Sequence, residues 1–166
     1  MKNILIIGGT KGIGKSIVDD LIDDNNITCL SRNKPEFQHQ NYTHREFDAL
    51  SDEYPQMENL DCLIYCPGSI NLKPISTLTL EDFRNDFEIN VIGAVKAIKK
   101  YLPLLKKSPS ASILLFSTVA TKLGMPYHAS VSVAKSGVDG LVKTLGSELA
   151  PKVRINAIAP TITNTD

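Results

Sequence analysis

The sequence predicts an α/β protein with a doubly wound parallel sheet, three α/β/α layers and about six strands. Short apolar runs that are typical of buried strands alternate with helical segments along the whole chain. This alternation indicates a parallel sheet, because right-handed crossovers place helices on both of its faces. The 166 residues, 42% of them hydrophobic, suit one domain with a single core. No repeat, low-complexity tract or linker divides residues 1–166.

The first half of the chain supplies four predicted strands and one predicted helix. Each strand is a short run rich in apolar or β-branched residues, and Pro67 and Gly68 stop the fourth. The polar segment 33–40 has no helical pattern, so one crossover is expected to be a short loop. The strands are predicted at 3–7, 27–30, 42–47 and 60–65, and the helix at 15–21.

The second half supplies two long predicted helices and two strands. Thr79 is followed by two acidic residues, which predicts a helix start because threonine caps free N–H groups and acids favour the first turn. Pro103 lies near the predicted end of that helix. The helices are predicted at 79–102 and 130–149, and the strands at 112–116 and 153–158.

Charge and cysteine content exclude several classes of protein. Lys+Arg 18 balances Asp+Glu 18, so nothing favours nucleic acid or an anionic membrane as a partner. Cys62 and Cys66 have no second pair of ligands nearby, so no metal site is predicted. No signal-peptide pattern follows Met1, and no apolar stretch reaches the ~18 residues of a membrane span. A cytoplasmic location is therefore expected.

A glycine-rich run at 8–14 joins the first strand to the first helix. Glycines let the backbone approach an anion, and the N–H groups and dipole of the helix point towards it. Such a run often only connects strand to helix, but here strand, spacing and helix agree, which favours dinucleotide binding. The predicted contacts are Gly8, Thr10, Lys11, Gly12, Ile13 and Gly14.

The spacing Gly8-x-x-x-Gly12-Ile13-Gly14 resembles the glycine signature of the short-chain dehydrogenase/reductase family. The resemblance covers essentially all 166 residues. It implies a Rossmann-type fold, a nicotinamide cofactor, and hydride transfer between that cofactor and a small carbonyl or alcohol substrate. Of the family's Asn-Asn-Ala-Gly after the fourth strand, only the glycine is kept, as Gly68.

The resemblance also assigns candidate catalytic residues. Asn90 matches a mid-helix asparagine that organises an active-site water, although a solvent-facing polar residue is the alternative interpretation. Lys135 matches the lysine that holds the nicotinamide ribose, and Thr118, beside Ser117, has the spacing of the serine that polarises the carbonyl. Val131 stands where the family has the tyrosine that transfers the proton, and valine has no proton to give.

The loss of the tyrosine leaves alternatives open. Tyr127 or His128 could supply the proton, or they could be a loop aromatic and a surface histidine. The chain could be a reductase or dehydrogenase with an unusual or absent proton donor. It could also be a cofactor-binding sensor or partner subunit with impaired catalysis, which Val131 favours, or a scaffold with a vestigial nucleotide cleft.

Cofactor choice depends on the end of the second strand. Members that prefer NAD place an acid there for the ribose hydroxyls. This chain has Ser31 and Arg32 there and Lys11 in the glycine loop, which favours the 2′-phosphate of NADP over NAD, unless both cations are merely solvated. The resemblance also places Asp48 beside the adenine ring and Thr165 beside the nicotinamide carboxamide.

Two further expectations follow from the resemblance. The long helices correspond to those that pair across subunits in the family, so a homodimer or homotetramer is expected. The family's substrate-covering segment and last strand have no counterpart in these residues. The identity of the substrate therefore cannot be predicted.

Overall fold

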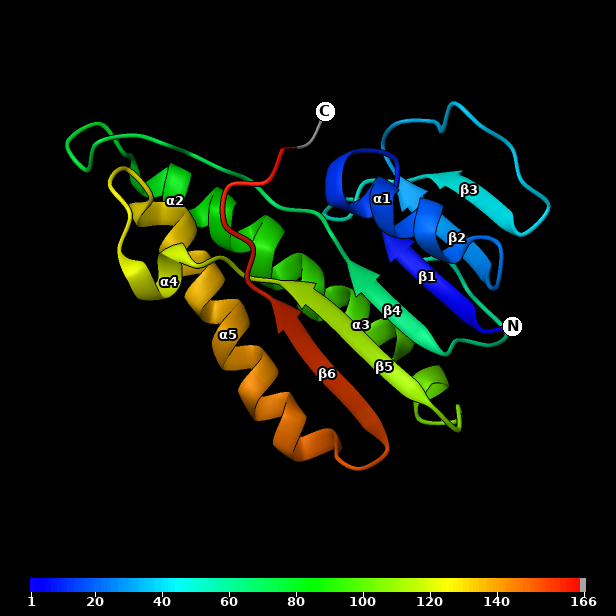
Figure 1. The fold of residues 1–166 in the computed structure, drawn as a ribbon. Coiled ribbons are helices and arrows are strands. Elements are labelled where there is room, and N and C mark those ends of the chain that lie inside the picture. The colour runs from blue at the N-terminus through cyan, green and yellow to red at the C-terminus, as the bar shows by residue number, and fades with distance from the viewer. Residues whose placement is uncertain (165–166) are drawn as a thin grey trace.

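The computed structural model describes residues 1–164. Six parallel strands form one sheet in the order β3-β2-β1-β4-β5-β6 (Figure 1). The predicted number and direction of the strands are confirmed. The strands are β1 Asn3–Ile7, β2 Asn26–Ser31, β3 Tyr42–Glu46, β4 Cys62–Tyr65, β5 Ala111–Phe116 and β6 Val153–Ile158.

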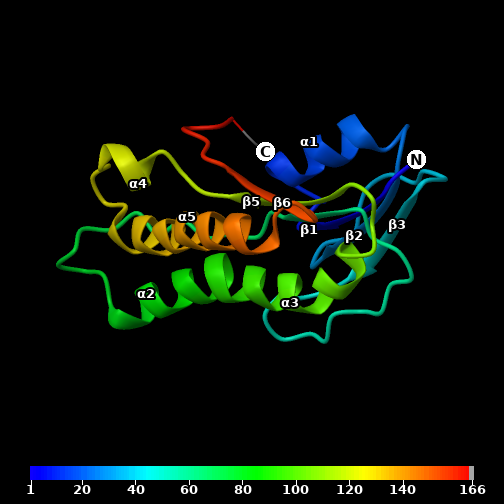
Figure 2. The ribbon, with the colours of Figure 1, turned by 90° about the horizontal axis from the view of Figure 1, so that it is seen from below.

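Helices cover the two faces of the sheet unequally. Figure 2 shows α1 on one side of the sheet and α2, α3 and α5 on the other. The connections from β2 to β3 and from β3 to β4 contain no helix. Within residues 1–164 no helix is long and apolar enough to cross a membrane. The helices are α1 Gly12–Leu21, α2 Leu80–Phe87, η1 Glu88–Ile92, α3 Gly93–Leu105, α4 Ala120–Leu123 and α5 Ala129–Leu149.

Strand β1 shows how the core is divided. Leu5 and Ile7 belong to a large apolar cluster with residues of α3 and α5, whereas Ile4 and Ile6 belong to a smaller cluster with α1. Successive side chains of a strand point to opposite faces, and all four are buried. A central parallel strand is therefore apolar throughout, which is why the run at 3–7 could be recognised as a strand.

The predicted helix 79–102 is not continuous. A π-helical segment, η1, separates α2 from α3, and α3 includes Pro103 and continues to Leu105. Side chains bind two of the carbonyls around η1: Asn90 Nδ2 donates to the carbonyl of Asp86 at 2.8 Å, and Tyr65 Oη donates to that of Ile89 at 2.8 Å. Such interruptions of a helix are frequent at functional sites.

Tyr65 and Gly93 fit together so closely that they predict a non-additive pair of mutations. A Cβ on Gly93 would collide with the Tyr65 hydroxyl, which burial keeps protonated by raising the pKa of Tyr65. Gly93→Ala is expected to cost about 1–3 kcal/mol of unfolding free energy in the wild-type background. The cost should fall in a Tyr65→Phe background. Urea denaturation of the four proteins measures it, and equal costs in both backgrounds would contradict the packing argument.

Candidate nucleotide-binding and catalytic site

The winding of the sheet reverses between β1 and β4, and this point defines the candidate site. Strands β2 and β3 continue from one side of β1, and β4, β5 and β6 continue from the other. Ligands of open α/β sheets bind beyond the carboxyl ends of the strands at such a point. A cavity of about 520 Å³ lies there. Seven of the predicted cofactor contacts line it: Gly8, Thr10, Lys11, Ser31, Arg32, Asp48 and Gly68.

The glycine loop leaves the start of α1 free to bind an anion. Gly8 and Gly12 have φ of +80° and +53°, values that favour glycine. Lys11, at the N-cap, makes no side-chain cap, and the first turn of α1 has no acidic residue. A Cβ on Gly14 would collide with the Gly8 carbonyl oxygen, so the loop lies tightly against the helix. This geometry fits the pyrophosphate of a dinucleotide.

Ser31 is buried, and its hydroxyl is already engaged. Its Oγ donates to the carbonyl of Asn33 at 3.0 Å, accepts from Thr10 Oγ1 at 3.2 Å, and lies 3.0 Å from His44 Nε2. A serine hydroxyl has one proton and two lone pairs, so these partners occupy it whichever ring nitrogen of His44 carries the proton. Ser31 therefore positions Thr10 and the Asn33 backbone and has no hydroxyl proton left for a ligand.

The charged residues that line the cavity are Lys11, Arg32, Asp48 and the buried Asp86. Both cations are exposed, and neither is in an ion pair with the described residues. Backbone N–H groups fix the Asp48 carboxylate: its Oδ1 accepts hydrogen bonds from the N–H groups of Leu50 at 2.8 Å and Ser51 at 3.3 Å. Free cations beside an immobilised carboxylate suit a phosphate-bearing ligand.

Lys135 reaches from α5 to the end of β5. Its Nζ donates to the carbonyl of Phe116 at 2.7 Å. Burial lowers the pKa of Lys135 from 10.5 to about 8, and the nearby Cys66 and Asp139 partly oppose the shift. A Cβ added to Gly68 would lie 3.4 Å from Lys135 Nζ, so the ammonium lies beside the cavity. An amine with such a pKa can exchange protons near neutral pH.

Asn90 lies beside Lys135 in a buried polar cluster. Its Nδ2 donates to Ser69 Oγ at 3.1 Å, and its Oδ1 would lie 3.0 Å from a Cβ on Gly68. This Oδ1 has no hydrogen-bond partner among the described residues. Asn90 is 2% exposed, which excludes the alternative of a solvent-facing helical residue. The free amide oxygen is available to a water or a ligand group.

Thr118 and Ser117 follow β5 directly. The Thr118 hydroxyl accepts from the N–H of Ala120 at 3.3 Å, and its own proton remains free to polarise a carbonyl. Ser117 is buried, and its Oγ has no partner among the described residues. Both hydroxyls thus stay candidates for that role.

The structure places the alternative proton donors at a second cavity. Val131 is 5% exposed on α5, one turn before Lys135. Tyr127 and His128 precede that helix and line a second cavity of about 510 Å³, with Lys73 and other residues but not with Val131 or Lys135. His128 Nδ1 lies 2.7 Å from the carbonyl of Pro126. Neither side chain lines the cavity of the candidate site.

Three residues of the site were missed by sequence reasoning, and one prediction cannot be examined. His44 contacts Ser31 from the neighbouring strand, and Ser69 and Asp86 surround Asn90. Only Asp86 left a signal, because it lies four residues before Asn90 in the predicted helix and thus shares its face. Thr165 lies outside the described residues. No cluster of metal ligands occurs in residues 1–164.

The sheet order, the glycine loop and the cavity together define a nucleotide-binding α/β protein of Rossmann type. The family model "short chain dehydrogenase" matches residues 2–166, so the chain belongs to that family. The family resemblance read from the sequence is confirmed.

Curated relatives include reductases of several kinds. A 3-oxoacyl-[acyl-carrier-protein] reductase of Synechocystis is 32% identical over 127 residues, covering 71% of this chain and 51% of that protein. A tropinone reductase homolog of Datura stramonium is 27% identical, covering 97% of this chain and 68% of that protein. The chain thus spans about half to two thirds of the length of these relatives.

Solved structures agree with the fold. The ligand-free aldohexose dehydrogenase of Thermoplasma acidophilum has a TM-score of 0.88 at 22% identity, covering 99% of this chain and 68% of that one. The structure of ElxO with NADP bound has a TM-score of 0.87 at 26% identity, covering 100% of this chain and 76% of that one. The first likeness supports the fold, and the second also concerns a protein that binds NADP.

Proposed function

We propose that this chain is an NADP-dependent oxidoreductase that acts on a small carbonyl or alcohol. The observation that carries the proposal is the position of Lys135. Its ammonium lies beside Gly68, which lines the same cavity as the two free cations Lys11 and Arg32. A nicotinamide cofactor supplies or accepts the hydride when it is bound.

The residues divide this work along the cavity. The N–H groups of Gly12, Ile13 and Gly14 at the start of α1 bind the pyrophosphate. Lys11 and Arg32 bind the 2′-phosphate, and Ser31 positions the loop beside them. Asp48 borders the adenine. The NADP-bound relative with 26% identity supports this choice of cofactor.

At the other end, Lys135 holds the nicotinamide ribose and keeps a proton available near neutral pH. Thr118 donates a hydrogen bond to the substrate oxygen, and Asn90 orders a water with its free Oδ1. Thr165 is proposed, from the resemblance alone, to contact the carboxamide.

The second candidate function is cofactor binding without efficient catalysis, as in a sensor or a partner subunit. Val131 favours it, because valine has no proton to give one turn before Lys135, and because burial raises the pKa of the Cys66 thiol near Lys135 to about 12. The two functions share the same cofactor and differ in turnover. Under either, we propose a homodimer or homotetramer, with the two long predicted helices, 79–102 (α2, η1 and α3) and 130–149 (α5), at the contact.

Titration with NADPH and NADH, followed by nicotinamide fluorescence, tests both candidates. We expect micromolar binding of NADPH and much weaker binding of NADH. If neither cofactor binds, both candidate functions fail together. If NADPH binds and no carbonyl in a substrate screen is reduced, the second function holds.

Arg32→Glu tests the phosphate contact directly. The substitution places a carboxylate where the 2′-phosphate is bound, and a charge-assisted hydrogen bond is replaced by repulsion. We expect NADPH affinity to fall about 100-fold, which corresponds to about 2.7 kcal/mol, with NADH affinity little changed. Lys34→Glu is the matched control, since Lys34 is exposed but does not line the cavity. Equal losses in the two variants would contradict the assigned contact.

A further inference from the structure

The least expected group in the site is the carboxylate of Asp86. Its side chain is completely buried, with 0% exposure, in the last turn of α2. Burying a carboxylate is unfavourable unless hydrogen bonds compensate it. One oxygen, Oδ1, has such bonds, whereas Oδ2 has no partner among the described residues.

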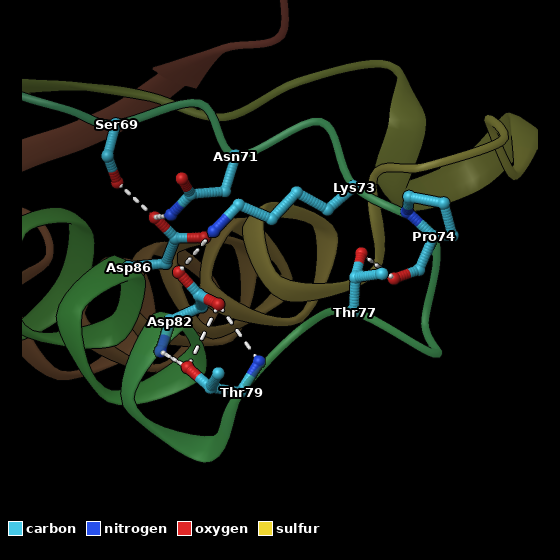
Figure 3. A network of polar contacts seen from close by, with 8 residues as sticks. All are labelled: Ser69, Asn71, Lys73, Pro74, Thr77, Thr79, Asp82 and Asp86. Atoms are coloured by element: carbon cyan, nitrogen blue, oxygen red, sulfur yellow. Dashed lines mark hydrogen bonds and ion pairs between the residues drawn. The ribbon is translucent and has the colours of Figure 1, made fainter.

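The donors to Asp86 come from the segment that follows β4. Ser69 Oγ and Asn71 Nδ2 both donate to Asp86 Oδ1, the second at 3.1 Å (Figure 3). Two residues further along, Lys73 Nζ donates to Asp82 Oδ1 at 2.9 Å. Alternate side chains of this segment, which we call the 69–73 clasp, thus bind two carboxylates one turn apart on α2.

The clasp has its polar side towards the protein and its apolar side outward. Ile70 and Leu72 lie between the polar residues and are 68% and 53% exposed. Apolar burial therefore does not hold this segment in place. Its side-chain bonds to α2 run through Asp86 and Asp82, and a backbone bond from the Lys73 N–H to the Tyr127 carbonyl, at 3.2 Å, also holds its far end. At the end near Gly68, Asp86 fixes the position of the segment through Ser69 and Asn71.

The position of the clasp determines the surroundings of Lys135. Gly68 directly precedes the clasp, and a Cβ there would lie 3.0 Å from Asn90 Oδ1 and 3.4 Å from Lys135 Nζ. Ser69 contacts Asn90 and Asp86 together. If Asp86 released the clasp, Gly68 would move from Lys135 and water would enter.

We infer that Asp86 is a positioning residue of the candidate site: through Ser69 and Asn90 it holds the segment that shields the Lys135 ammonium from water. Asp86 does not touch Lys135. The other groups that face Lys135 are the Cys66 thiol after β4, Asp139 on α5 and the Phe116 carbonyl on β5. Asp139 and Phe116 are held by their helix and strand, and the Cys66 backbone is held by its N–H, which donates to the Ile7 carbonyl at 2.9 Å, so none of these groups depends on the clasp for its place. The importance of this shielding for turnover rests on the proposed function.

Titration of Lys135 by NMR tests the inference on the protein without cofactor. Lysine labelled with ¹³C at Cε gives one signal per side chain, and the Lys135 signal is the one lost in Lys135→Arg. Burial lowers the pKa of Lys135 to about 8 in the wild type. In Asp86→Ala we expect the midpoint of the Lys135 titration to rise by about one pH unit, a tenfold change in proton affinity. The reason is that water would reach the Lys135 ammonium and stabilise its charged form.

Two variants separate positioning from general destabilisation. Asp86→Asn keeps an oxygen that accepts from Ser69 and Asn71, so its midpoint should stay close to that of the wild type. Asp82→Ala removes the contact with Lys73 at the other end of the clasp and the capping box with Thr79. It leaves the contacts of Asp86 with Ser69 and Asn71 beside Gly68 intact. The midpoint of the Lys135 titration should therefore stay at the wild-type value in this variant too. Should Asp86→Ala not fold, Ser69→Ala supplies the same test with a smaller rise.

An unchanged midpoint in folded Asp86→Ala, or an equal rise in Asp82→Ala, would overturn the inference. Neither result bears on whether NADPH binds the wild type. The cofactor titration is thus the experiment that can refute the proposed function, and the lysine titration is the one that can refute the role of Asp86.

Discussion

Gly14→Ala is expected to weaken cofactor binding strongly and to destabilise the protein substantially. The new Cβ would collide with the carbonyl oxygen of Gly8. Both atoms belong to backbone that other contacts fix, since the N–H of Gly8 donates to the Leu30 carbonyl at 2.8 Å and Gly14 lies in α1. No side-chain rotation can relieve the contact, so the loop and the start of α1 must separate. We expect a loss of about 3 kcal/mol of unfolding free energy.

Cofactor binding should weaken in this variant as well as stability. The pyrophosphate needs the loop backbone and the first N–H groups of α1 at one place, so NADPH affinity is expected to fall at least about 100-fold, or about 2.7 kcal/mol. Gly140→Ala is the matched control: a Cβ there meets no atom within 4 Å, and alanine in a helix should stabilise by about 0.5–1 kcal/mol. Unaltered NADPH binding by Gly14→Ala would exclude this loop as the pyrophosphate site.

The fold could be predicted from the sequence because its signals are local. The apolar run at 3–7, the glycines after it and Thr79 before the acids each specify a strand, a turn or a helix start without reference to distant residues. The π segment could not be predicted in this way. It depends on Tyr65, from a strand 24 residues before Ile89 in sequence, which binds a carbonyl in the interrupted helix. The short helix α4 likewise has no apolar pattern of its own.

The candidate site was predicted where the chain itself supplies the geometry. The glycine loop lies within one strand–turn–helix unit, and Gly8, Thr10 and Lys11 line the cavity as expected, whereas Gly12, Ile13 and Gly14 are not among its lining residues. The hydrogen bonding of the Ser31 hydroxyl depends instead on His44 of the adjacent strand. The register of β2 against β3 brings the two residues together, and the sequence of either strand alone does not predict that register. Asp86 shares a helix face with Asn90, but the donors that make its burial tolerable come from the loop after β4.

Val131→Tyr is expected to raise the rate of carbonyl reduction by about 10²–10⁴-fold, or roughly 3–5 kcal/mol of barrier. The residue lies one helical turn before Lys135, so both side chains leave the same face of α5. The Lys135 ammonium would lower the pKa of the new phenol and would hold its proton near the substrate oxygen that Thr118 polarises. Because Val131 is 5% exposed, the larger ring is expected to cost about 1–3 kcal/mol of stability.

Single-turnover and steady-state rates with NADPH and a panel of small ketones and aldehydes measure the gain. Val133→Tyr is the control, since Val133 is 56% exposed on the same helix and points away from Lys135; its rate should stay at the wild-type value. A large gain at 131 alone means that Lys135, Thr118 and the cofactor cavity are already arranged for chemistry and lack only an acid. No gain in a folded variant that binds NADPH would mean that the substrate side of the site is not assembled, and cofactor binding without turnover would then describe the chain.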